Sequence, residues 1–219
     1  MDFLDNLKLI SAIAMLILVV VAAIQQKRDN KKSSGSWEDV AQKTGLRFFD
    51  RGAEDQELRG EYRGYRTRVK VRTEREQQGR YSETVFYTTV EVDTREETVK
   101  EVFLRLRNEE EKPKILRKQK NQSFGTRFLV TTDSQSQHIF QPDELRTAFL
   151  AMASAGDIVR LRGGRLKRER RALFVETHDL IQFLRSTTDL MERLDIGARQ
   201  LEEEVHEQEQ QEVSATGLW

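Results

Sequence analysis

The feature that most constrains this chain is an uninterrupted apolar run near the N-terminus. Leu9 to Ile24 reads LISAIAMLILVVVAAI, with one hydroxyl and no charge. As a helix this run would extend roughly 24 Å, a little less than the roughly 30 Å of a bilayer's hydrocarbon core. Lys8 can snorkel and the amides of Gln25 and Gln26 can reach the headgroups. We therefore expect residues 1–26 to form a transmembrane anchor.

A cleaved signal peptide is the alternative, because residues 21–23 (VAA) are small enough for a signal peptidase. The flanking charges favour an anchor, since two Asp and one Lys precede the run and the excess of cations follows it. These membrane-flanking cations are Lys27, Arg28, Lys31 and Lys32. By the positive-inside rule, the N-terminus lies outside and the remaining chain lies in the cytoplasm. The expected location is the cytoplasmic (inner) membrane, with the lipid bilayer as one partner.

Three further regions follow the anchor. Residues 27–35 (KRDNKKSSG) contain no apolar side chain and predict a flexible basic tether. Residues 36–198 carry the periodic apolar positions of a single folded domain. Residues 199–219 are rich in Glu and Gln and predict an acidic tail, either as a helix extension, as a strand of a weak coiled coil, or frayed at its end.

Alternating apolar residues and turn signals predict the elements of the domain. Helices are expected from Ser36 to Gly45, from Pro142 to Gly156, and from Thr177 onward. Residues 74–82 and 108–122 are expected to form loops. The expected strands are Leu46–Phe49, Leu58–Tyr62, Tyr65–Thr73, Thr84–Val92, Val99–Leu106, Arg127–Thr132, Ile158–Leu161 and Arg165–Val175.

This order of elements predicts an α+β fold. A run of strands joined by short turns gives an antiparallel sheet, and the helices that follow must bury their apolar stripes on it. We expect the helices to cover one face of the sheet, with the long C-terminal helix among them.

Short motifs at both ends of the domain resemble a known group of proteins. They include Trp37, Val40 and Ala41, the glycines Gly60 and Gly64, and the RFLV stretch at residues 127–130. This pattern resembles that of uncharacterised bacterial proteins that carry such a domain behind one or two membrane spans. The resemblance implies an architecture and a bacterial membrane setting, and it implies no site.

The composition excludes several kinds of chemistry. The chain has no Cys, which excludes disulfides, thiolate metal sites and thiol nucleophiles. Its 37 basic and 37 acidic residues give no net charge, which argues against a wholly basic nucleic-acid-binding surface. The sequence has no phosphate-binding loop or nucleophile elbow, and its three His residues are scattered. We therefore predict no catalytic, cofactor-binding or metal-binding residues, and a protein that is not an enzyme.

The densest charge feature is a basic hairpin near residue 165, where one Glu opposes seven cations. Such a patch could bind anionic lipid, nucleic acid or an acidic partner. Nucleic acid is disfavoured because no aromatic platform is interleaved with the cations. Alternatively, the cations pair with acids of neighbouring strands, such as Glu83, Glu91 and Asp93. The candidate residues are Arg160, Arg162, Arg165, Lys167, Arg168, Arg170 and Arg171.

Two more charged segments accompany this hairpin. Period-two geometry places Arg66, Arg68, Lys70 and Arg72 on one face of a strand. The tail between Glu202 and Glu212 is acidic, so it either keeps the C-terminus soluble or covers a basic face.

Together these features predict a membrane-tethered interaction or scaffold module on the cytoplasmic face, acting as an accessory subunit of a membrane assembly with a protein partner or a second copy of itself. A peripheral reader of anionic lipid or nucleic acid through residues 160–171 is one alternative. An enzyme whose site has no sequence signature is another.

The topology can be tested with one introduced thiol, because the chain has no Cys of its own. Ser214→Cys should resist a membrane-impermeant maleimide in intact cells and react after lysis. Labelling in intact cells, or a mature N-terminus near Ile24 by mass spectrometry, would contradict both the orientation and the anchor.

Overall fold

The computed structural model covers the whole chain and describes residues 15, 35–52, 55–78, 81–100, 102–107, 124–131 and 139–215. Eight strands form one sheet: β1 (Arg47–Asp50), β2 (Gln56–Tyr62), β3 (Tyr65–Gln78), β4 (Tyr81–Asp93), β5 (Phe103–Leu106), β6 (Phe128–Thr131), β7 (Ile158–Arg162) and β8 (Arg165–Arg170). The labelled helices are α2 (Glu97–Lys100), α3 (Phe124–Arg127), α4 (Asp143–Ser154) and α5 (Thr177–Ala215), and residues 35–44 form a further helix before β1.

All neighbouring strands of the sheet pair antiparallel, in the order β1-β2-β3-β4-β8-β7-β5-β6. After β4 the chain forms β5 and β6, which lie at the far edge of the sheet, and then continues into α4. The β7–β8 hairpin then fills the space between β4 and β5. The expected α+β class with an antiparallel sheet is confirmed.

Two tight turns set the registers of the hairpins. Arg63 and Gly64 have φ values of 54° and 79° between β2 and β3, and Gly163 and Gly164 have 56° and 69° between β7 and β8. Two successive residues at positive φ make the turn whose twist matches that of antiparallel strands, which explains the glycines. Gly64 is further constrained by Arg95, because a Cβ at residue 64 would lie 1.5 Å from the guanidinium.

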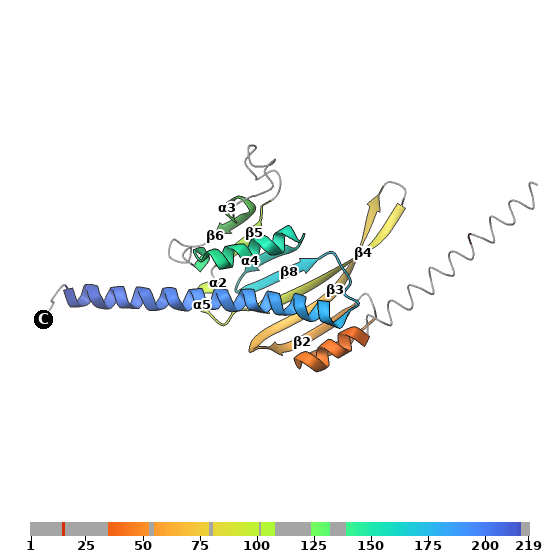
Figure 1. Ribbon diagram of the computed structural model, residues 1–219, viewed down its shortest axis with the longest axis horizontal. Helices are drawn as coiled ribbons and strands as arrows, with labels where there is room; N and C mark the ends of the chain where they lie inside the picture. The colour runs from red at the N-terminus through yellow and green to blue at the C-terminus, as the bar shows by residue number, and fades with distance from the viewer. Residues whose placement is uncertain are drawn as a thin grey trace, which may run out of the picture.

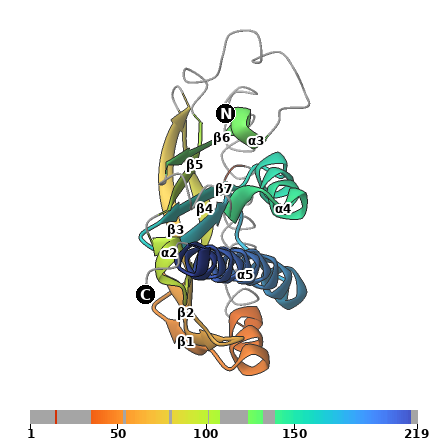
Figure 2. The same cartoon turned by 90° about the vertical axis from the view of Figure 1, so that its left-hand side faces the viewer.

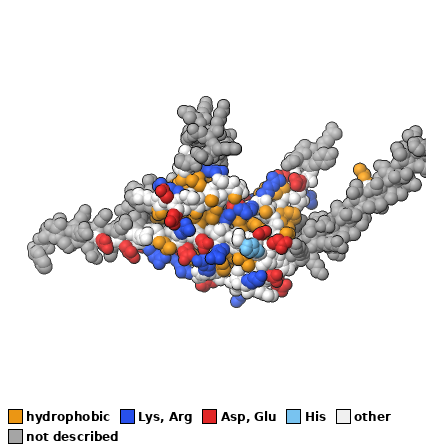
Figure 3. Space-filling view, in the orientation of Figure 1, with side chains coloured by type: hydrophobic (Ala, Val, Ile, Leu, Met, Phe, Trp, Pro, Cys, Tyr) orange, Lys and Arg blue, Asp and Glu red, His pale blue; other side chains and the backbone are white. Residues whose placement is uncertain are grey.

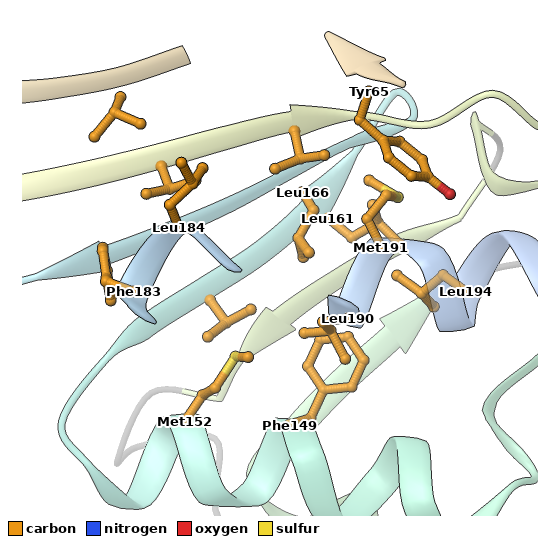
Figure 4. Close-up of a cluster of buried hydrophobic side chains, with 14 of the residues drawn as sticks. Tyr65, Phe149, Met152, Leu161, Leu166, Phe183, Leu184, Leu190, Met191 and Leu194 are labelled. Carbon is orange, nitrogen blue, oxygen red and sulfur yellow. The ribbon is translucent and has the colours of Figure 1, made fainter. Parts of the chain in front are cut away.

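The helices cover one face of the sheet, as expected. Figures 1 and 2 show α4, α5 and the helix over residues 35–44 on the same side of the strands. Figure 4 shows side chains of α4 and α5, such as Phe149, Leu184 and Met191, pointing to the strands and their apolar side chains. In β3, Val69 and Val71 are buried on this face, whereas Arg66 on the alternate face is exposed.

Three secondary-structure predictions were wrong. Residues 74–78 and 81–82 are not a loop, because β3 and β4 stay in register as far as the pair Gln78↔Tyr81. This polar ribbon gains ladder hydrogen bonds and contacts such as Tyr87 hydroxyl to Glu76 (2.6 Å), which apolar alternation does not reveal. The expected strand at 99–106 begins as α2 and becomes β5 only at Phe103. The last expected strand ends at Arg170, not at residue 175.

The expected membrane span lies outside the described residues, except for Met15. Among the residues that the structure describes, no helix is both long enough and apolar enough to cross a bilayer. Residues 108–122, expected to form a loop, lie outside the described part as well.

Helix α5 is 39 residues long and extends past the domain. Its buried side chains in the described part end at Ala198, and Arg199 makes an ion pair of 3.4 Å with Glu96. Beyond this point the helix projects from the sheet (Figure 1). We call residues 199–215 the arm. Residues 199–215 continue the helix, and the described side chains on them are exposed.

Trp37 ties the helix over residues 35–44 to the segment that precedes α5. Its side chain is completely buried and its indole N–H donates to the carbonyl of Phe174 at 3.3 Å. Trp37→Ala should lower the free energy of unfolding by about 3–5 kcal/mol, through lost packing and an orphaned carbonyl. Urea unfolding followed by circular dichroism measures this change. Trp37→Phe is the matched control and should cost less, because it keeps most of the packing. A loss below about 1 kcal/mol for the Ala variant would place this helix outside the core.

Candidate functional site

Strand alternation divides the seven predicted cations of the β7–β8 hairpin between two faces of the sheet. Leu166 of β8 is buried beneath the helices, so Arg168 and Arg170 point to the same side. Lys167 lies on the opposite face, together with Arg165. In β7, Val159 and Leu161 are buried, which leaves Arg160 and Arg162 on that opposite face as well. The sequence therefore identified the basic hairpin, but it could not show that its cations lie on two faces of the sheet with different surroundings.

Arg168 is a buried structural residue. Only 5% of it is exposed, and its Nε donates to Asp157 Oδ2 at 2.6 Å, where Asp157 is 1% exposed. Arg168 also donates to the hydroxyl of Ser186 at 2.6 Å and lies over the ring of Phe183. Burial lowers the pKa of Arg168, and the charge and hydrogen bond of Asp157 oppose that shift. This group joins β8 to α5.

Arg170 completes the same cluster. Its Nε and Nη2 donate to the two carboxylate oxygens of Asp157 at 2.6 and 2.9 Å, and its guanidinium lies 5.1 Å from the centre of the Phe183 ring. One buried carboxylate thus binds two arginines at the boundary between sheet and helix. Arg168 is buried, and Arg170, whose side chain is 31% exposed, is already paired with Asp157, so we assign neither to the candidate contact surface.

Three other hairpin cations also form ion pairs. Arg165 Nε lies 2.6 Å from Asp93, Lys167 lies 3.4 Å from Glu169, and Arg171 lies 3.2 Å from Glu76. The contacts of Arg165 and Arg171 agree with the alternative in which cations pair across the sheet, whereas Lys167 pairs within its own strand, β8. Two of the expected acids take part, since Asp93 pairs with Arg165 and Glu83 lies 3.9 Å from Arg171. Glu91 pairs with Lys70 at 3.3 Å and not with a cation of the hairpin.

Arg160 and Arg162 remain exposed and have no ion pair within the described part of the chain. The strand register places Arg160 opposite both Arg105 of β5 and Lys167 of β8, and it places Arg162 opposite Arg165. Like charges directly opposite each other destabilise a sheet. We call Arg105, Arg160, Arg162, Arg165 and Lys167 the basic strand patch.

The basic stripe on β3 is largely neutralised. Arg68 hydrogen-bonds Glu57, and Arg72 Nη2 lies 3.0 Å from Glu169. Burial opposes ionisation of Glu169, but hydrogen bonding from Arg72 and the charge of Lys167 outweigh it, so the pKa of Glu169 is lowered. Beside the stripe lies a hollow of about 570 Å³. Its lining is of mixed charge: Arg59, Gly60, Glu61, Arg66, Thr67, Arg68, Glu91, Asp93 and Arg165.

A second polar cluster fastens the β2–β3 turn to α5. Asp195 is buried and accepts hydrogen bonds from Thr94, from the backbone N–H of Arg95 and from the hydroxyl of Tyr65. Burial and the neighbouring Asp195 carboxylate raise the pKa of Tyr65 to about 12. Arg95 stacks on the Tyr65 ring and donates to the carbonyl of Gly64 at 2.7 Å. Every described group in this cluster has a partner within the fold, so its role is structural.

The helix layer carries charges of both signs, as Figure 3 shows along α5. A groove of about 370 Å³ runs between α4 and α5, and it is lined partly by the alanines Ala148, Ala151 and Ala155. Among the described residues, no three His, Asp or Glu side chains come together as a metal site. The membrane-flanking cations Lys27, Arg28, Lys31 and Lys32 lie outside the described residues.

Comparisons with protein-family models, with curated proteins and with solved structures find no match for this chain. The geometry of the described residues leaves the basic strand patch accessible to a ligand or a partner.

The division of the hairpin cations predicts unequal effects of mutation. Arg168→Ala leaves Asp157 buried with one cation fewer and should lower the free energy of unfolding by about 3–5 kcal/mol. Arg162→Ala removes a solvated side chain and should change it by less than about 0.5 kcal/mol. Urea unfolding of both variants measures the difference. Equal costs for the two variants would contradict the division.

Proposed function

We propose that this protein is a membrane-tethered interaction module on the cytoplasmic face, in which the arm carries the contact with a protein partner. The observation that carries the proposal is the continuation of α5 as an exposed helix beyond its last buried residue. In this role the protein serves as an accessory, non-enzymatic subunit of a membrane assembly.

The position of the tether supports this role. Residues 27–35 lead directly into the helix over residues 35–44, and Ser36 Oγ lies 3.2 Å from the Thr177 hydroxyl at the start of α5. Thr177 in turn donates to Asp39 at 3.4 Å. The tethered end of the domain and the first turn of α5 therefore lie together, while the arm forms the opposite end of that helix.

The length of α5 determines how far the arm extends from the N-terminal end of this helix. Its 39 residues span about 58 Å at about 1.5 Å per residue. A membrane anchor before residue 27 would place the N-terminal end of this helix near the bilayer, and the arm can then reach components well away from the surface. The arm itself accounts for about 25 Å of that length.

The arm is poorly stabilised by its own sequence. Acidic residues concentrate at the C-terminal end of α5, where the helix dipole disfavours negative charge, and the last turn contains no basic residue. An unsupported helical segment of this length is marginal in water. A partner that contacts the arm would supply the missing stabilisation, and this supports an interaction function.

A photo-crosslinking experiment tests the proposal in the full chain. Benzoylphenylalanine introduced at Glu203 or Glu207, both exposed on the arm, should give a discrete protein adduct after irradiation of native membranes. The matched control is the same residue at Gln42, which is exposed on the helix over residues 35–44. Failure of both arm positions to form an adduct, or equal adducts at position 42, would overturn the proposal.

A further inference from the structure

The basic strand patch lacks a counterion at its centre. Arg160 and Arg162 are exposed, have no ion pair in the described part of the chain, and face three like-charged neighbours across the strands. In contrast, Arg165 and Lys167 at the same patch each have an acid within 3.4 Å. The patch therefore presents an excess of positive charge on the sheet face opposite α4 and α5.

The arm presents the complementary charge. Glu203 and Glu207 are exposed and lie one helical turn apart, so their spacing along the axis is about 6 Å. Arg160 and Arg162 are two residues apart on a strand, which gives about 6.8 Å. A helix laid along β7 can thus bring two carboxylates opposite two guanidinium groups. Figure 3 shows acidic side chains on the part of α5 that projects.

We propose that the basic strand patch binds the acidic arm of a second copy of this chain. This inference rests on the proposed function, because it names the partner of the arm. The contact relieves two unfavourable arrangements at once: the like-charge pairs across β5, β7 and β8, and the acids at the negative end of α5.

A chain cannot make this contact with its own arm. α5 is one continuous helix from Thr177 to Ala215, and it lies on the side of the sheet opposite the patch (Figure 2). Reaching the patch would require the helix to break and turn around the edge of the sheet. The contact therefore joins different copies. Since each copy offers one arm and one patch, two copies can exchange arms reciprocally, or copies can follow one another in a ring or a row.

Anionic lipid is the competing ligand for the patch. A lipid headgroup would neutralise Arg160 and Arg162, but it would leave the acidic arm without a counter-charge. The second copy supplies anions at a matching spacing, in a chain whose positive and negative residues are equal in number. The observations on both surfaces therefore favour self-association.

Complementary charge reversal provides the test. One full-length variant carries Arg160→Glu and Arg162→Glu, and the other carries Glu203→Arg and Glu207→Arg. In zwitterionic detergent at low salt, wild type should form dimers or larger assemblies by sedimentation velocity. Each variant alone should associate about tenfold or more weakly. An equimolar mixture should regain assembly, because residues 160 and 162 of each variant then meet residues 203 and 207 of opposite charge on the other variant.

A charge-matched control is Lys43→Glu with Arg185→Glu, two exposed cations on the helix layer. This variant should assemble like wild type. Assembly of all samples should fade above about 0.5 M salt as the Debye length shortens. No recovery in the mixture overturns the inference, and it does so in favour of lipid if only the patch variant loses binding to anionic vesicles.

Crosslinking separates this inference from the proposed function. Two differently tagged chains, one with Arg162→Cys and one with Glu207→Cys, should form a mixed bismaleimide adduct in native membranes. An adduct only between two Glu207→Cys chains indicates arm pairing with arm, and it overturns the inference. If position 207 captures a protein of different mass, the arm still has a partner and only the second-copy inference fails. If position 207 captures nothing, both fail.

Discussion

The packing of α5 across the sheet is the interaction on which the rest of this structure depends. Its own side chains Leu184 and Met191 are fully buried against the sheet, which alone would expose one apolar face. The helix touches strands that are distant in sequence, including β4 and β8, and it also packs on α4. Burial of this one stripe fixes the inner face of the sheet and leaves the other face for charges.

Two polar clusters give this packing a definite position. Asp157 holds Arg168 and Arg170 against Phe183, and Asp195 holds Tyr65 and Thr94 near the other end of the contact. A buried carboxylate is tolerated only with such partners, because its desolvation is costly. The clusters therefore restrict how α5 can slide or turn on the sheet, and they set the direction in which the arm leaves the domain.

The direction of the arm determines how it lies relative to the basic strand patch, the other surface to which we assign an interaction. The contact between Ser36 and Thr177 places the beginning of the helix over residues 35–44 at the start of α5, and the arm lies at the other end. Helix α5 covers one face of the sheet (Figure 2), and strand alternation places the basic strand patch on the opposite face. An acidic projection and a basic face that cannot meet within one chain are the arrangement that repeated head-to-tail contacts require.

The sequence by itself determined the elements whose signals are local. The alternation in Tyr65–Thr73, the paired turn residues and the long apolar stripe after Thr177 correctly predicted two hairpins, a long helix and an α+β fold. Period two also predicted that Arg66 and Arg72 share a face, because this follows from strand geometry alone. The polar ribbon at 74–78 and 81–82 was missed, since its support comes from cross-strand pairing and not from apolar residues.

Only the tertiary structure decided which of the seven hairpin cations could meet a partner. Arg168 and Arg162 look equivalent in the sequence, but one is buried on Asp157 and the other is exposed. The difference arises because α5 covers one face of β8, where Arg168 meets Ser186, 18 residues further along the chain. Likewise, the insertion of β7 and β8 between β4 and β5 determined that Arg165 meets Asp93. Local periodicity assigns residues to two faces, whereas long-range packing decides which face is buried and which charges become neighbours.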